Sequence, residues 1–589
     1  MSIPLLRLLN ANIRQQTSRC GSYKVTCAKV CAHANSRRCL LSNSSAADVS
    51  LDALYRIFTI PEAPDSTLGR IERHLSENLA GFLSDHIVAK EKPLHEIEED
   101  FADSEIPEQP TFVSEHTDEL LNKLVAHSVH TASPRFIGHM TSALPYFLLP
   151  LAKLMVGLNQ NLVKIETSKA FTPLERQVLG MMHHLVYGEQ EKFYQHWMHS
   201  AEHSLGAFCS GGTVANITAL WVARNKLFAA QPGFAGVATE GLAAGLQHYG
   251  YKKACVMVSE RGHYSLSKAA DVLGIGRANL VAIATDKNNR MDIEALRKGC
   301  QQIADEGGRV MALVGIAGTT ETGHIDPLEK MADVAAEIGA HFHVDAAWGG
   351  ATLLSSTHRG LLQGIERADS VTIDAHKQMY VPMGAGMVLF RDPALVHAIE
   401  HHAEYVIRRG SKDLGSHTME GSRPGMAMLV YSALHVMGRR GYQLLIDQSI
   451  DKAQAFSALI HQQPDFEVVT EPELCLLTYR YVPADIKEVL ANANEEQMNR
   501  ITPILNQLTK HVQKSQRESG NAFVSRTKLT PHQYFHQPST VFRTVLANPL
   551  TTMQMLSEIL EEQREIGENA PHTLHALYAE ARDCGLLSG

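Results

Sequence analysis

A series of short apolar, β-branched runs between residues 206 and 390 is the clearest pattern in this chain. They alternate with amphipathic, helix-like stretches, and the runs are ACVMVS (254–259), NLVAIAT (279–285), VMALVGIAG (310–318), HFHVDAA (341–347), SVTIDA (370–375) and GMVLF (386–390). Such alternation is typical of buried strands in a parallel sheet covered by helices. It predicts an α/β domain in which ligands bind at the carboxyl ends of the strands.

One helix in this region has both of its ends marked in the sequence. Asp326 suits the N-cap position, Pro327 suits the first turn, and Gly339 suits the position after the last turn. We therefore expect a helix that starts just after Asp326 and ends just before Gly339.

The segments around this domain differ in composition. Residues 48–160 are predicted to form an N-terminal helical segment, in which HEIEEDFADSEIPEQP (95–110) has the acidic, Pro-containing composition of a linker. We expect the large sheet domain over 161–395 and a smaller C-terminal α+β domain over 396–589.

Residues 1–47 form a basic leader with no acidic residue and with four of the nine cysteines. Its Arg- and Ser-rich composition suits an organelle transit peptide, and a disordered extension is the other interpretation. The uneven cysteine spacing contains no C-x2-C pair, so a zinc site is the least favoured interpretation of this segment.

Overall composition narrows the class of protein further. The chain has 589 residues, 44% hydrophobic and 20% charged, with a formal net charge of −9. These values are ordinary for a globular protein and give no basic patch for nucleic acid. No apolar run reaches the roughly 18 residues of a membrane span, and the scattered remaining cysteines favour a reducing compartment such as the cytoplasm.

Four groups of polar residues follow predicted strands or open predicted helices. Ser210, Gly211, Gly212 and Thr213 form a small-residue turn before a helix, where free N–H groups favour a phosphate. Asp345 ends an apolar run and His263 follows another. Taken singly, each also has an ordinary structural interpretation, as a tight turn, a turn carboxylate or a strand-end histidine.

The fourth group contains Lys377, next to His376 and followed by the apolar Met379, Val381 and Met383. A solvated loop lysine is one interpretation. An amine in apolar surroundings is also a nucleophile suited to Schiff-base formation. Pyridoxal 5'-phosphate requires a lysine for its aldehyde, a carboxylate for its pyridine nitrogen, a phosphate site and a group stacked on its ring. The four groups together therefore predict this cofactor.

The motifs SGGTVAN, HYSLSKAADVLGIG, AGTTETGHIDPL, HVDAAWGG, DAHK and EGSRPG also resemble the group II pyridoxal-phosphate decarboxylases, over about residues 134–548. The resemblance implies the fold-type I, aminotransferase-like architecture with a seven-stranded sheet. It also implies a homodimer with active sites at the subunit interface.

The resemblance further implies roles for single residues. Lys377 would bind the cofactor aldehyde, Asp345 would pair with the pyridine nitrogen, and His263 and Ala347 would lie on opposite ring faces. Thr319 would lie near the cofactor. The phosphate would be held by Ser210, Gly211, Gly212, Thr213 and His376, with Ser422 reaching the phosphate of the partner subunit.

Other positions bear on the reaction and its substrate. Tyr405, 28 residues after Lys377, matches the mobile-loop tyrosine implicated in proton donation in relatives, although it could be a surface residue. Gln378 stands where many relatives have an aromatic residue, which puts the subfamily in doubt. Arg480 resembles the family arginine that binds a substrate carboxylate, and Arg135 and His139 are further candidate anion contacts.

These cationic candidates and the low aromatic content (6%) favour an acidic amino acid as substrate. The stretches 157–178 and DAHKQMYVPMGAGMV most resemble the bacterial aspartate 1-decarboxylases, which implies conversion of L-aspartate to β-alanine for pantothenate and coenzyme A synthesis. L-Glutamate is the alternative substrate, followed by cysteine sulfinate or an aromatic amino acid. A homologue that binds the cofactor without catalysis is the alternative from another class of protein.

Overall fold

The computed structural model describes residues 67–84, 88–89, 92–402 and 410–588. The predicted leader (1–47) and Tyr405 therefore lie outside the described residues. The chain divides into two compact units, one of residues 1–60 with 105–113 and one of residues 61–104 with 114–589. The description that follows concerns the second unit.

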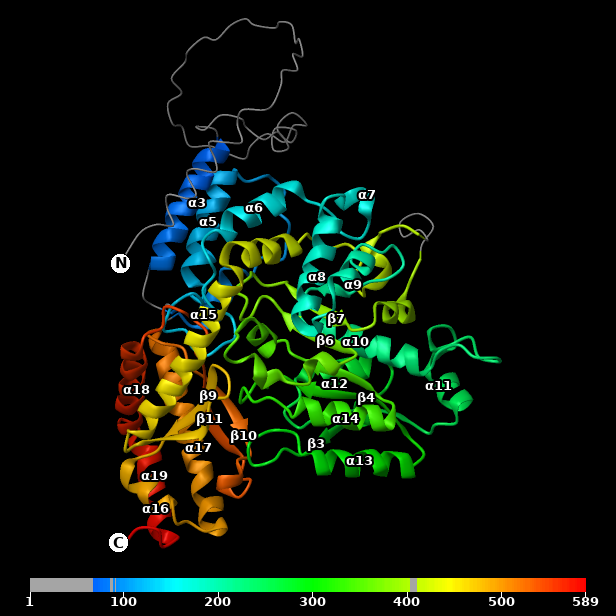
Figure 1. The fold of residues 1–589 in the computed structure, drawn as a ribbon. Coiled ribbons are helices and arrows are strands. Elements are labelled where there is room, and N and C mark those ends of the chain that lie inside the picture. The colour runs from blue at the N-terminus through cyan, green and yellow to red at the C-terminus, as the bar shows by residue number, and fades with distance from the viewer. Residues whose placement is uncertain (1–66, 85–87, 90–91, 403–409, 589) are drawn as a thin grey trace, which may run out of the picture. The chain divides into compact units, whose positions relative to one another are not determined.

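A seven-stranded sheet forms the centre of this unit, with the order β1-β7-β6-β5-β4-β2-β3 (Figure 1). Its strands are β1 (Gly206–Cys209), β2 (Ala254–Ser259), β3 (Leu280–Ile283), β4 (Arg309–Ile316), β5 (His341–Asp345), β6 (Ser370–Asp374) and β7 (Gly386–Phe390). The strands from β3 to β6 pair in parallel, and β7 is antiparallel to both β6 and β1. The predicted mainly parallel α/β sheet is confirmed, and every strand except β7 has its carboxyl end at the same edge.

Both faces of this sheet are buried, which explains why its strands are near-continuous apolar runs. On one face, α10 (Gly212–Leu227) and α12 (Tyr264–Val272) pack against alternate strand residues such as Val256 and Val314. The other face is covered by α8 (Phe171–Tyr187), α13 (Ile293–Asp305), α14 (Leu328–Ile338) and part of α15 (Ala427–His461). The sheet is therefore rigidly held, and its strand ends can position side chains accurately.

The helix expected after Asp326 is α14, and it ends before Gly339, which adopts the left-handed conformation with φ 63°. The expectation that Asp326 caps this helix is wrong. Its buried carboxylate instead accepts hydrogen bonds from the backbone N–H groups of Met291 (2.8 Å) and Ile316 (2.9 Å). Burial raises the pKa of Asp326 to about 6.

The C-terminal part contains a second, antiparallel sheet with the order β10-β11-β9-β8. Its strands are β8 (Phe466–Thr470), β9 (Leu476–Tyr481), β10 (Ser525–Leu529) and β11 (Ser539–Val545). This sheet packs against the long helix α15 and has its own core with α17 and α18 (Figure 1). The helices here are α16 (Ala484–Leu490), α17 (Glu495–Ser519), α18 (Met553–Glu568) and α19 (Pro571–Asp583).

The remaining elements are helices on the N-terminal side and short connecting turns. The α-helices are α3 (Thr67–Ser84), α4 (Leu94–Glu99), α5 (Val113–Lys123), α6 (Leu148–Leu158), α7 (Ile165–Ser168), α9 (Glu191–Trp197) and α11 (Val237–Tyr249). The 3₁₀ helices are Val125–His127, Arg277–Asn279, Gly349–Leu354, Arg359–Leu362, Ile365–Arg367, Pro393–Ile399, Leu414–His417 and His532–Tyr534. Across the described part of the chain, no helix has the length and apolarity needed to cross a bilayer.

Candidate functional site

The polar groups predicted from the sequence converge on one cavity of about 330 Å³ at the carboxyl edge of the seven-stranded sheet. Ligands of open α/β sheets bind at this edge. The cavity is lined by residues that follow different strands of the sheet: Ser210, Gly211, Gly212 and Thr213 after β1, His263 after β2, Asp345 and Ala347 at the end of β5, and His376 and Lys377 after β6.

Asp345 is buried at the end of β5, and each of its carboxylate oxygens accepts a hydrogen bond. Asn216 Nδ2 donates to Oδ2 (2.8 Å), and the backbone N–H of Ala347 donates to Oδ1 (3.1 Å). These bonds fix the plane of the carboxylate where it lines the cavity. The group is therefore positioned to accept one further hydrogen bond from a protonated ring nitrogen.

Lys377 lies in the turn that follows β6, with its Nζ 3.3 Å from Oδ2 of Asp374. His376 Nε2 is 3.5 Å from the same oxygen. Burial lowers the pKa of His376, while the charge of Asp374 opposes this shift. The carboxylate of Asp374 therefore interacts with both the lysine and the histidine and holds them close together. The sequence analysis did not single out Asp374, although it is the first residue of the DAHK motif.

The turn from Gly211 into α10 allows a close approach of backbone and ligand. A Cβ atom on Gly212 would lie 2.8 Å from Oδ2 of Asp374, and one on Gly211 would lie 3.4 Å from Cε1 of His376. No side chain caps the first turn of α10, so its N–H groups and dipole favour an anion at this edge of the cavity. The backbone N–H of Ser210 donates to Glu420 (2.9 Å).

His263 occupies the N-cap position of α12, and its Nδ1 accepts a hydrogen bond from the backbone N–H of Ser265 (3.3 Å). Burial lowers the pKa of His263, against the opposing charge of Asp345. The imidazole is therefore neutral near pH 7 and presents a flat, uncharged ring. Ala347 lines the same cavity with its small side chain.

Some of the predicted residues do not reach this cavity. Arg480 is fully buried in β9, where its Nε forms an ion pair with Glu467 and its guanidinium stacks 4.1 Å from the centroid of the Tyr534 ring. Arg135 forms an ion pair with Glu558 on α18. Both cations are thus paired within the protein away from the cavity lining.

Two further candidates do not line the cavity. The hydroxyl of Thr319 is 2.7 Å from that of Thr322 within the turn after β4, and Gly318 and Thr320 line the cavity instead. Ser422 is exposed and accepts a hydrogen bond from Asn161 Nδ2 (2.9 Å).

Arg543, a buried residue of β11, is a cation near the cavity that the sequence analysis missed. Its Nε donates to the carbonyl of Thr320 (2.6 Å), and its Nη1 donates to that of Gly138 (3.2 Å). Burial lowers the pKa of His139, and the charges of Arg543 and Lys377 lower it further. His139 therefore lies near both cations but does not line the cavity, and its role as an anion contact stays a prediction.

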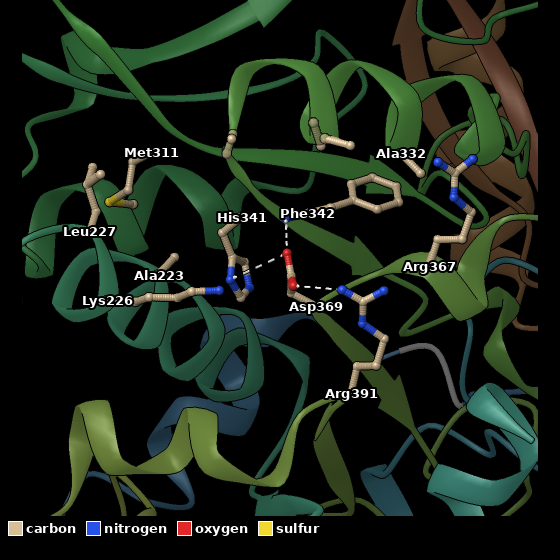
Figure 2. Close-up of a pocket in the computed structure, with 14 residues that line it drawn as sticks. Ala223, Lys226, Leu227, Met311, Ala332, His341, Phe342, Arg367, Asp369 and Arg391 are labelled. Atoms are coloured by element: carbon tan, nitrogen blue, oxygen red, sulfur yellow. Dashed lines mark hydrogen bonds and ion pairs between the residues drawn. The ribbon is translucent and has the colours of Figure 1, made fainter. Parts of the chain in front are cut away.

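A second cavity, of about 470 Å³, lies at the amino ends of β4, β5 and β6, opposite the first (Figure 2). Asp369 accepts hydrogen bonds there from the backbone N–H of Phe342 (2.9 Å) and from Arg391 (3.2 Å). Lys226 extends toward the ring of His341 (Figure 2). The predicted groups are absent from its lining, so the first cavity is the candidate active site.

The lining of the first cavity supplies the groups that pyridoxal phosphate requires. It offers the amine of Lys377, the carboxylate of Asp345, the neutral ring of His263 and the glycine turn before α10. In addition, Nδ1 of His376 is buried beside that turn without a hydrogen-bond partner. These residues fit the cofactor and its phosphate.

Comparisons with known proteins point to the same group as the motifs. The family model described as "Pyridoxal-dependent decarboxylase conserved domain" matches residues 93–482. An aspartate 1-decarboxylase of Aliivibrio fischeri is 63% identical over 538 residues, which cover 91% of this chain and 98% of that protein. A cysteine sulfinic acid decarboxylase of Mus musculus is 27% identical and covers 76% of this chain and 84% of that protein. The crystal structure of mouse CSAD superimposes with a TM-score of 0.72 at 25% identity, covering 85% of this chain and 98% of that chain.

Proposed function

We propose, for a chain that belongs to the pyridoxal-dependent decarboxylase family, that it converts L-aspartate to β-alanine and carbon dioxide. The observation that carries this proposal is that Lys377 and Asp345 line one cavity beside a buried arginine, Arg543. When bound, pyridoxal phosphate supplies a conjugated ring that accepts the electron pair left by the departing carboxylate.

The residues of the chain have separate tasks in this reaction. The amine of Lys377 would hold the cofactor at its aldehyde, the group that the substrate amine also requires. Asp345 would hold a proton on the ring nitrogen, and the neutral His263 would offer a flat ring face without adding a competing charge. Gly211, Gly212 and the first turn of α10 would hold the phosphate, with His376 beside them.

Besides its α-carboxylate, L-aspartate carries a side-chain carboxylate, and binding that group requires a cation or several hydrogen-bond donors. We assign Arg543 to a substrate carboxylate, since a buried guanidinium beside the cavity can bind a carboxylate through two parallel hydrogen bonds. His139, close to Arg543 and Lys377, lies where it can contact the same substrate. The Aliivibrio fischeri relative named aspartate 1-decarboxylase supports aspartate over glutamate.

We also propose that the active enzyme is a homodimer. Apolar side chains on and just before α6 are exposed in the single chain, including Tyr146 (82% exposed), Leu154 (49%) and Val156 (70%). Exposed apolar surface of this kind marks an interaction site, and a second copy would cover it. Ser422 is proposed to reach the phosphate of the partner subunit.

Two further proposals concern parts outside the described residues. Tyr405 is proposed to donate the proton that completes the amine product. The cytoplasm is the proposed location, with an organelle matrix as the alternative if residues 1–47 are a transit peptide.

The test compares kcat/KM for L-aspartate, L-glutamate, L-cysteine sulfinate and an aromatic amino acid under saturating pyridoxal phosphate. We expect the highest value for L-aspartate, with β-alanine and carbon dioxide formed in equal amounts. A higher value for another substrate would overturn the substrate assignment. Absence of carbon dioxide from every substrate would favour a non-catalytic homologue.

A further inference from the structure

Asn216, on the first turns of α10, is almost completely buried and uses its whole side-chain amide in hydrogen bonds. Its Nδ2 donates to Asp345 Oδ2 (2.8 Å) and to Ser265 Oγ (3.1 Å), and its Oδ1 accepts from His343 Nε2 (3.0 Å). Ser265 Oγ is in turn 2.9 Å from Nδ1 of His263. One amide therefore connects the two side chains assigned to the cofactor's ring nitrogen and ring face.

The direction of these hydrogen bonds follows from the chemistry of the groups. A carboxylate only accepts hydrogen bonds, so the NH₂ group of Asn216 must face Asp345. Its oxygen then faces Nε2 of His343, which must carry a proton. Because burial lowers the pKa of His343, the ring is neutral at pH 7. With its proton on Nε2, its Nδ1 accepts a hydrogen bond from the Ser370 hydroxyl (2.9 Å) and donates none to the Ser370 carbonyl oxygen 3.2 Å away.

The same hydrogen-bond chain continues to the opposite edge of the sheet. Nε2 of His341 donates to Ser370 Oγ (2.7 Å), and Nδ1 of His341 faces Asp369 Oδ2 at 3.9 Å. Figure 2 shows this end, where Lys226 approaches His341 and Arg391 approaches Asp369. This series of hydrogen bonds thus runs through the sheet from the candidate active site to the second cavity.

The donor-to-acceptor direction of this series of hydrogen bonds does not depend on the protonation state of His341. A proton added to Nδ1 of His341 would face Asp369 and would leave the donor at Nε2 unchanged. His343 therefore meets the same hydroxyl with His341 neutral or charged. The orientation of the Asn216 amide is fixed in both cases.

We propose that Asn216 is a positioning residue for Asp345 and His263, and that His343, held by Ser370 and His341, stabilises its amide in the orientation that Asp345 requires. This inference rests on the assignment of pyridoxal phosphate to the first cavity. Failure of the wild-type protein to bind the cofactor would contradict that assignment. If the wild type binds the cofactor but the variants described below do not differ from their controls, only the inference about Asn216 is contradicted.

The first test replaces Asn216 with leucine and uses Asn225→Leu as its matched control. Asn225 is a buried asparagine of the same helix, and its amide bonds to the carbonyl of Ala398 (2.7 Å), remote from the cavity lining. We expect Asn216→Leu to lower kcat by about 10- to 100-fold and to weaken cofactor binding by about tenfold. Asn225→Leu should change neither quantity, although both variants lower the melting temperature.

The second test compares two amides at position 343, in case Asn216→Leu does not fold. The nitrogen of a glutamine reaches the place of Nε2 and can still donate to Asn216, whereas an asparagine reaches only the place of Nδ1. We expect the dissociation constant of pyridoxal phosphate in His343→Gln to stay within about threefold of the wild-type value. The absorbance maximum of the bound cofactor should stay within about a few nanometres of that of the wild type. His343→Asn should lose about tenfold in both cofactor affinity and kcat, with a KM for L-aspartate close to that of the wild type.

The outcomes separate positioning from a general structural role. Equal behaviour of His343→Gln and His343→Asn, whether both active or both impaired, would overturn the proposal. A loss of kcat in Asn225→Leu equal to that in Asn216→Leu would overturn it as well.

Discussion

Replacing Asp345 with asparagine removes one negative charge from the cavity with almost no change in shape. A carboxylate and a positively charged ring nitrogen about 4 Å apart attract each other by about 4 kcal/mol at an effective dielectric constant of 20. That attraction is needed most while the ring accepts electrons. Asp345→Asn should therefore lower kcat by about three orders of magnitude, with a much smaller change in KM.

The same substitution also changes hydrogen bonding. Both carboxylate oxygens of Asp345 accept bonds, from Asn216 and from the backbone of Ala347, but an asparagine has only one oxygen. Its NH₂ group must face another donor in a buried place, which costs about 1–3 kcal/mol. The apoprotein should therefore unfold at a lower temperature than the wild type.

The assay measures steady-state carbon dioxide release at saturating cofactor, together with cofactor affinity and the melting temperature. Asp326→Asn is the matched control, because Asp326 is also buried and accepts two backbone hydrogen bonds away from the cavity lining. It should lose stability and keep its kcat. A kcat within tenfold of the wild type for fully loaded Asp345→Asn would refute the role of this carboxylate.

Further substitutions test other parts of the account. Lys377→Ala should keep the fold by circular dichroism but lose the absorbance of bound cofactor and all turnover; normal activity would remove this lysine from the site. Arg543→Met should raise KM for L-aspartate by about tenfold or more. Arg480→Met should lower stability without a selective effect on KM. The reverse result would restore Arg480 as the substrate ligand. Burial lowers the pKa of Lys452 from 10.5 to about 8, so the unfolded chain binds more protons between these values and stability should increase as pH rises through this window. In Lys452→Met the increase should be smaller, as measured by urea unfolding at pH 7 and pH 10, and an unchanged increase would contradict the shift.

Much of the sheet could be predicted because its strands are buried on both faces and are therefore marked by apolar runs. The predicted run at 254–259 is β2 (Ala254–Ser259), and the run at 386–390 is β7 (Gly386–Phe390). Local sequence patterns predicted the role of a side chain less well where its hydrogen-bond partner is distant in sequence. Asp326 has the residue type of an N-cap, yet Met291 and Ile316 compete for its carboxylate.

The candidate site was predicted best where a residue ends a strand, as Asp345 does, or lies in the turn just after one, as Lys377 does. The sequence analysis named Arg480 as the substrate arginine, whereas the structure places Arg543 near the cavity. The partners of an arginine in a strand depend on the register of the sheet. Glu467 lies opposite Arg480 in the pairing of β8 with β9, and this pairing is not visible in the local sequence. Arg543 reaches Thr320 from 223 residues away along the chain. Asn216 stood within a recognised motif, but its bond to Asp345 spans 129 residues.

The most direct test of the central claim is reductive trapping of the loaded wild-type enzyme with borohydride, followed by peptide mass mapping. The account predicts one phosphopyridoxyl group per chain, attached to Lys377, and its loss when L-aspartate is present in excess during reduction. Labelling of a different lysine, or stable labelling of Lys377 that L-aspartate does not displace, would contradict the account.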